Sequence, residues 1–256
     1  MAIKKLVALN AVFTLAVGLG WTLFVPYLVS LGYSHLDVML FFATFFSASL
    51  LVMAVTRNWK TKNYLTFGLG LRALTFLAAT QVSHHFHLYL IALIYSVIMT
   101  DFWVVYNSLV QNRTTHSNRA FTNSVVMGAG FLVNIIAPAA AGIIAGQYGF
   151  NWAFAAGFLA MLPAIWLARG LGEKRMHISL FKSLKSNKRL QEITFLEGFA
   201  HGASWIIPMI VTLQFITGVV EFGSFFSYLA LIGAGSALFL TKKSDKGGKR
   251  GTYITP

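Results

Sequence analysis

The stretch that decides the fold is residues 6–31, LVALNAVFTLAVGLGWTLFVPYLVSL, in which no side chain is charged. A bilayer has a hydrocarbon core about 30 Å thick, which an α-helix of about 20 apolar residues can cross. The stretch is long enough, and it lacks the strict alternation of polar and apolar residues that marks a strand. Because a helix pairs its own backbone groups where lipid offers none, we expect a membrane-spanning helix here.

The composition of the whole chain fits this first stretch. Of the 256 residues, 57% are apolar and only 11% are charged, whereas about 25% are charged in a typical soluble domain. So little charge excludes a water-soluble enzyme. The chain has no cysteine, which excludes disulfides and thiolate metal sites.

Further apolar blocks predict an all-α integral membrane protein with about eight transmembrane helices. We expect these spans over residues 6–31, 38–55, 63–82, 88–110, 121–146, 152–168, 191–215 and 219–240. The longest loop follows the sixth block. It divides the chain into a six-helix half at 1–169, a basic cytoplasmic linker at 170–190, and a partial second half of two helices and a basic tail at 191–256.

The basic residues are distributed by side of the membrane. Of the 20 Lys and Arg residues, 19 lie at the termini or in alternate loops, and the other loops hold none. Positively charged loops stay in the cytoplasm. The pattern therefore predicts a multi-pass protein of the cytoplasmic membrane with both termini in the cytoplasm. The net charge of +13 becomes an orientation signal, so we expect the lipid bilayer and not nucleic acid as the partner.

Two pairs of stretches indicate that the chain repeats itself. Spans 1 and 7 share a glycine and a proline six residues apart, at Gly20 and Pro26 and at Gly202 and Pro208. The loop after span 2 and the tail after span 8 are both basic. The first contains Arg57 and Lys60, and the second contains Asp245, Lys246, Gly248, Lys249 and Arg250.

Span 5 carries a third pattern, Asn134-Ile-Ile-Ala-Pro138-Ala-Ala-Ala-Gly142. Small residues let helices approach closely, and Gly142 with Gly146 forms a face of small residues four apart. Pro138 removes one backbone hydrogen bond and permits a bend. We therefore expect Pro138, Gly142 and Gly146 to form a packing motif.

The order of these features resembles the major facilitator superfamily. The tail after span 8 is similar to the family's loop pattern Asp-Arg-x-Gly-Arg-Arg, although Thr241 replaces its leading glycine, and the first copy keeps only the basic residues. The resemblance implies that these two loops gate a rocking motion. It also implies that the span 5 pattern is more typical of exporters, which exchange solute for protons. The family has twelve spans, so this chain is expected to be truncated by about four.

Charged residues inside spans are functional candidates because mid-bilayer charge is costly. Arg72 and Asp101 lie at equal expected depth in adjacent spans, which predicts a buried ion pair, either fixed or linked to gating. Glu197 and His201 are four residues apart in span 7 and share a helix face. This pair is a candidate for carrying a proton. The alternative is that the pair only faces water or the inner headgroups.

Polar residues within spans 1, 4 and 5 are candidates for a solute and ion pathway. Asn10, Asn107 and Asn134 join Asp101, Glu197 and His201 in this set. Polar side chains also hold helices together, and that alternative applies to each asparagine. His84, His85 and His87 form a cluster without a nearby acid in the sequence, so we expect no metal. We find no catalytic cluster or cofactor motif.

Two functions remain open from the sequence. The first is secondary active transport of a small solute by alternating access, with proton-coupled efflux as a candidate mode and no cofactor. The second is a truncated, non-transporting fragment or degraded paralogue with a structural role, whose partner would be a missing C-terminal half.

Overall fold

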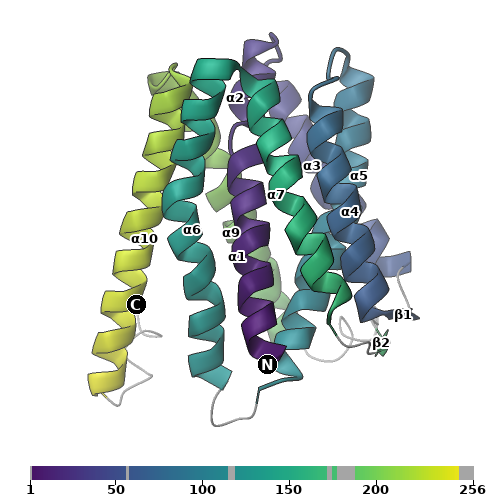
Figure 1. Ribbon diagram of the computed structural model, residues 1–256, viewed down its shortest axis with the longest axis vertical. Helices are drawn as coiled ribbons and strands as arrows, with labels where there is room; N and C mark the ends of the chain where they lie inside the picture. The colour runs from purple at the N-terminus through teal and green to yellow at the C-terminus, as the bar shows by residue number, and fades with distance from the viewer. Residues whose placement is uncertain (1, 56–57, 115–118, 172–174, 178–187, 248–256) are drawn as a thin grey trace.

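Long helices that run roughly parallel to one another form a single bundle in the computed structural model (Figure 1). It describes residues 2–55, 58–114, 119–171, 175–177 and 188–247. The helices are α1 (Ala2–Gly20), α2 (Phe24–Ser30), α3 (His35–Val55), α4 (Thr61–Ala79), α5 (His85–Gln111), α6 (Arg119–Tyr148), α7 (Phe150–Arg169), α9 (Lys188–Phe215) and α10 (Val219–Gly247).

The predicted all-α membrane class is confirmed, since each of the predicted spans coincides with helix. Within the described residues, 6 helical segments are long and apolar enough to cross a membrane. These are Ile3–Ser30, His35–Val52, His85–Gln111, Gly128–Tyr148, Phe150–Arg169 and Val219–Ser236. The other two predicted spans correspond to α4, which carries Lys62 and Arg72, and to α9, whose apolar part is Gly202–Phe215.

The first span is interrupted, which the sequence analysis did not predict. α1 ends at Gly20 and α2 begins at Phe24. Pro26 has no N–H to donate to the carbonyl of Thr22, and its ring crowds that carbonyl. The chain tightens instead, and the Phe24 N–H donates to the Trp21 carbonyl at 3.0 Å. The corresponding proline of span 7, Pro208, lies inside an uninterrupted α9.

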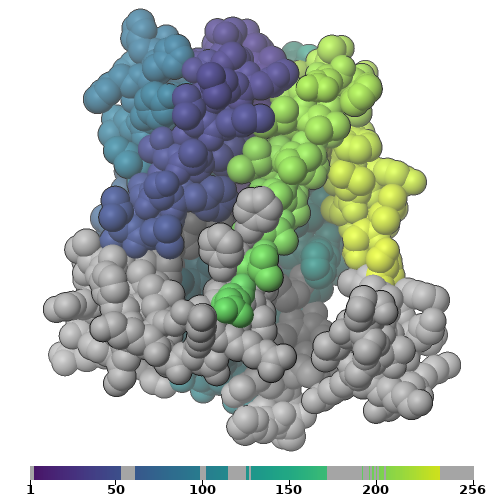
Figure 2. All heavy atoms as spheres, turned by 180° about the vertical axis from the view of Figure 1, so that it is seen from behind, coloured from purple at the N-terminus to yellow at the C-terminus, as the bar shows by residue number. Residues whose placement is uncertain are grey.

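α1 lies between α6 and α7 (Figure 1). Gly20 and Gly157 allow α1 and α7 to meet backbone to backbone, because a Cβ at Gly157 would lie 2.8 Å from the Gly20 Cα. Aromatic rings fill the space towards α5, where Phe13 stacks on Phe102 with ring centroids 3.6 Å apart. On the reverse side, α9 lies between α3 and α10 (Figure 2).

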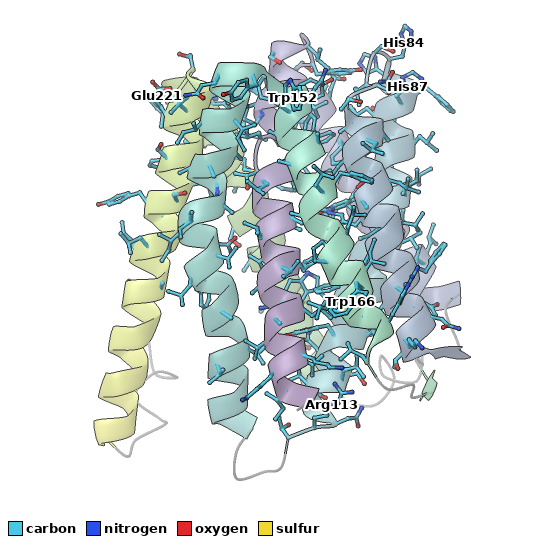
Figure 3. The ribbon with its side chains drawn as sticks, in the orientation of Figure 1. His84, His87, Arg113, Trp152, Trp166 and Glu221 are labelled. Carbon is cyan, nitrogen blue, oxygen red and sulfur yellow. The ribbon has the colours of Figure 1, made fainter. Side chains whose placement is uncertain are left out.

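The two ends of the bundle differ in charge. We call the end that carries Lys4, Lys62, Arg113 and Arg169 the basic end; Figure 3 shows Arg113 there. The opposite end carries a capping box at the start of α3. The Ser34 N–H donates to the Asp37 carboxylate at 2.8 Å, and the Asp37 N–H donates to the Ser34 hydroxyl at 3.2 Å. Such reciprocal bonds satisfy backbone donors that a helix start leaves unpaired.

A short ribbon at the basic end joins two loops that are far apart in sequence. Strand β1 (Asn58–Lys60) pairs antiparallel with β2 (Arg175–His177), with Trp59 opposite Met176. The sequence predicts only helices and loops here, so the ribbon corrects that prediction. The structure also extends α10 to Gly247, so Asp245 and Lys246 lie in its last turn and not in a loop.

Candidate functional site

The most buried charge of the described chain is Arg72 on α4, whose side chain is 0% exposed. Its guanidinium carbon lies 3.9 Å from the ring centroid of Tyr95 on α5 and 4.5 Å from that of Trp21, in the turn between α1 and α2. The Phe76 ring is 5.3 Å away. We call these four residues the arginine box. A guanidinium is attracted to the faces of aromatic rings, more strongly where water is excluded.

Hydrogen bonding to Arg72 is missing inside this box. Its Nε, Nη1 and Nη2 atoms are buried without a hydrogen-bond partner among the described residues. A buried cation without an anion is costly, and the rings offset only part of that cost. The side chain of Asp101 lies outside the described residues, so the predicted ion pair stays a prediction. Along α5, Asp101 is six residues from Tyr95, which is about 9 Å of helix rise.

Sequence reasoning found Arg72 but missed its aromatic neighbours. Trp21 and Tyr95 come from spans 1 and 4, and neither has a local pattern that connects it with Arg72. The available signal was the position of Trp21 inside the Gly20–Pro26 stretch. There the helix breaks, and an aromatic side chain from the break reaches the interior.

Close packing of α6 on α10 joins the six-helix part to the last helix. A Cβ at Gly142 would lie 2.9 Å from the Val219 carbonyl oxygen and 3.3 Å from the Gly223 Cα. A Cβ at Gly146 would lie 2.6 Å from a methyl group of Val220. The small residues of span 5 thus face α10, and we call this contact the α6–α10 seam.

Pro138 contributes a polar contact to the same seam. The proline ring disturbs the local hydrogen bonding of α6, and the next N–H, that of Ala139, donates to the Ser227 hydroxyl of α10 at 2.9 Å. A Cβ at Gly223 would collide with the Pro138 carbonyl oxygen. The seam therefore combines direct backbone approach with one hydrogen bond between the helices.

The three candidate asparagines have different surroundings. Asn10 is buried, and its Nδ2 donates to the Val126 carbonyl of α6 at 2.9 Å, while its Oδ1 is buried without a partner among the described residues. This bond ties α1 to α6. Asn134 on α6 is half-buried, and Asn107 on α5 is exposed. Asn10 therefore links α1 to α6.

Comparison with known proteins now identifies the family. Residues 6–255 match the family profile described as Major Facilitator Superfamily. The chain belongs to the Major Facilitator Superfamily. The resemblance inferred from the motif order is therefore confirmed, and the chain is a multi-pass membrane protein of a transporter family. No curated protein matches the chain.

For this superfamily member, several predicted site residues fall where side chains are not described. Glu197 and His201 lie on α9, and Lys60 lies in β1, but their side chains are outside the described residues, as are those of Asp245 and Lys246. The remaining motif residues lie outside the described chain altogether: Arg57, Gly248, Lys249 and Arg250. Their roles stay predictions.

One polar contact corrects the analysis of the histidine cluster. His85 has an acid beside it, because its Nε2 lies 3.1 Å from the Asp37 carboxylate of α3. This neighbour was missed because the two residues lie at the starts of different helices, α3 and α5, 48 residues apart in sequence. Among the described residues, no group of three or more histidines and acids could hold a metal ion.

Proposed function

We propose that this superfamily member is a secondary active transporter that moves a small solute across the cytoplasmic membrane by alternating access. Both termini lie in the cytoplasm, as the one-sided distribution of basic residues indicates. The solute pathway runs beside α1 and α6, where the Asn10 Oδ1 has no hydrogen-bond partner among the described residues and Asn134 is half-buried.

The observation that carries alternating access is the α6–α10 seam. Rocking requires one group of helices to pivot against another. Gly142 and Gly223 let α6 and α10 meet along bare backbone, so few side chains must repack when the two helices slide. A seam of interlocked large side chains would instead resist such a motion.

Proton coupling through α9 is the second element of the proposal. Glu197 and His201 lie four residues apart on one helix, so they share a face. A carboxylate in low dielectric binds its proton more tightly, and a neighbouring histidine can exchange that proton near neutral pH. Efflux of solute against proton entry is the direction that the span 5 pattern favours.

Flux in proteoliposomes tests the proposal. The full chain is reconstituted with an imposed pH gradient, and uptake of a panel of sugars, amino acids, carboxylates and organic cations is followed by mass spectrometry. We expect Glu197→Gln to reduce gradient-driven flux at least tenfold. Glu192→Gln is the matched control, because Glu192 is exposed on the same helix. Equal flux in both variants would remove the proton role, and no flux for any solute would overturn transport by this chain.

A further inference from the structure

A pocket opens on the outward-facing surface of the bundle near its basic end, where α4 begins and α7 ends. Its volume is about 450 Å³, and its lining residues are Lys62, Asn63, Thr66, Phe67 and Arg169. We call it the headgroup pocket. From these residues and the surface beside them, we propose that it binds the phosphate of an anionic phospholipid, whose acyl chains lie in the groove between α4 and α7.

The polar side of the pocket is suited to a phosphate. Lys62 and Arg169 bring two cations from two helices, and no acidic residue is among the lining residues that the structure describes. Asn63 adds an amide donor. The Thr66 hydroxyl already donates to the Lys62 carbonyl at 2.8 Å, so its oxygen remains an acceptor. Arginine and lysine with amide donors are the groups that bind phosphate in proteins.

Helix stability does not explain Lys62, whereas Arg169 lies in the last turn of α7, where the helix dipole favours a cation. Lys62 lies in the first turn of α4, where the helix dipole disfavours positive charge, and that turn holds no acid. The end of α7 already has a cation beside it, since the Lys5 Nζ lies 3.3 Å from the position of a Cβ at Gly170. Neither cation has an ion-pair partner among the described residues, and an anion held between Lys62 and Arg169 would provide one.

The surface next to the pocket is suited to acyl chains. On α7, Leu159, Leu162 and Trp166 are exposed and recur with helical spacing on the face that ends at Arg169. Trp166 is 73% exposed and lies one turn before Arg169 in the basic half of α7 (Figure 3). Tryptophan at that position matches the level where membrane headgroups meet hydrocarbon.

On α4 as well, exposed apolar side chains follow the polar residues of the pocket. Asn63, Phe67, Gly70, Leu74 and Leu77 share one face of the helix by their spacing, and the large residues among them are exposed. A Cβ at Gly70 would meet no atom within 4 Å, so the surface between Phe67 and Leu74 is uncovered at that point. A polar pocket with an exposed apolar surface next to it fits a phospholipid and not a free anion. The inference does not depend on the transported solute.

A titration of the purified full chain tests this site. The chain is kept in detergent, phosphatidylglycerol is added, and the half-saturating concentration is read from the rise in Tm. Each cation near an anionic lipid contributes about fivefold in affinity. We therefore expect about fivefold weaker binding for Lys62→Gln and about twenty-five-fold for Lys62→Gln with Arg169→Gln. Phosphatidylcholine and inorganic phosphate are expected to leave Tm unchanged.

Two further variants make the result decisive. Lys4→Gln removes an exposed cation from the same end of the bundle but outside the pocket, so its affinity should equal that of the parent chain. Gly70→Phe keeps both cations and fills the groove, so it should weaken phosphatidylglycerol binding even if the double variant fails to fold. Equal weakening by Lys4→Gln, full binding by Gly70→Phe, or a Tm rise with inorganic phosphate alone would each overturn the proposal.

Discussion

Adding one methyl group at Gly142 tests whether α10 packs on α6 as described. In Gly142→Ala, the new Cβ would lie 2.9 Å from the Val219 carbonyl oxygen, 3.2 Å from the Val220 Cα and 3.3 Å from the Gly223 Cα. Ordinary contacts of this kind are about 3.5–4.0 Å. All three neighbours are backbone atoms, so no side-chain rotation relieves the contact. The two helices must separate by about 0.5–1 Å to restore ordinary distances.

The expected loss in the free energy of unfolding is obtained by comparing Gly142→Ala with a matched variant on the same helix. Overpacking of a close contact costs about 1–3 kcal/mol, while replacing glycine by alanine inside a helix gains about 1 kcal/mol. Gly128→Ala isolates the second effect, because a Cβ at Gly128 would meet no atom within 4 Å. We therefore expect Gly142→Ala to be less stable than Gly128→Ala by about 2 kcal/mol.

Thermal unfolding of the purified chain in detergent measures this difference. For a chain of this size, about 1 kcal/mol shifts Tm by about 2–4 °C. The Tm of Gly142→Ala should thus fall about 4–8 °C below that of Gly128→Ala. Gly146→Ala should cost less, since its close neighbour is a Val220 methyl group that can rotate. Equal Tm values for Gly142→Ala and Gly128→Ala would refute the backbone contact at the seam.

Three further variants address other contacts. In Arg72→Met, an apolar side chain replaces a buried cation that has no hydrogen bond within the described part of the chain, so Tm should stay equal or rise; a loss of about 3–5 kcal/mol would instead indicate the ion pair with Asp101. Ala139→Cys with Ser227→Cys should form a disulfide under mild oxidation, visible as a mobility shift, because the chain has no other cysteine and the two positions share a hydrogen bond. Ser34→Ala removes the capping box of α3 and should lower stability by about 1 kcal/mol in the same melting assay.

The helices were predictable because each apolar run can satisfy its own backbone hydrogen bonds as a helix, which lipid requires. Backbone groups pair within the segment, so residues 88–110 required no knowledge of their neighbours to be assigned, and the structure has α5 over His85–Gln111. The interruption at Trp21–Leu23 was missed because a hydropathy profile records neither Pro26 nor the backbone hydrogen bonds around it, and a proline such as Pro208 can also lie inside an unbroken helix.

The site was predictable as a set of residues but not as a set of contacts. Equal depth in adjacent spans suggested Asp101 as the partner of Arg72. Depth along a helix fixes neither the face from which a side chain leaves nor its length. The structure adds that the guanidinium lies on Trp21 and Tyr95, while its pairing with Asp101 stays a prediction. His85 and Asp37 meet for the same reason: tertiary packing brings them together without any pattern in the sequence around either residue.

The ribbon between β1 and β2 has a consequence for the order of synthesis. β1 precedes α4, whereas β2 follows α7, so the ribosome must produce four helices before the second strand exists. Until then Asn58–Lys60 is an unpaired edge, which another extended chain could occupy. Pairing with Arg175–His177 closes that edge and ties the start of α4 to the segment beyond α7. The ribbon can therefore form only after α7 has been synthesised, so its presence shows that all helices from α1 to α7 have been made.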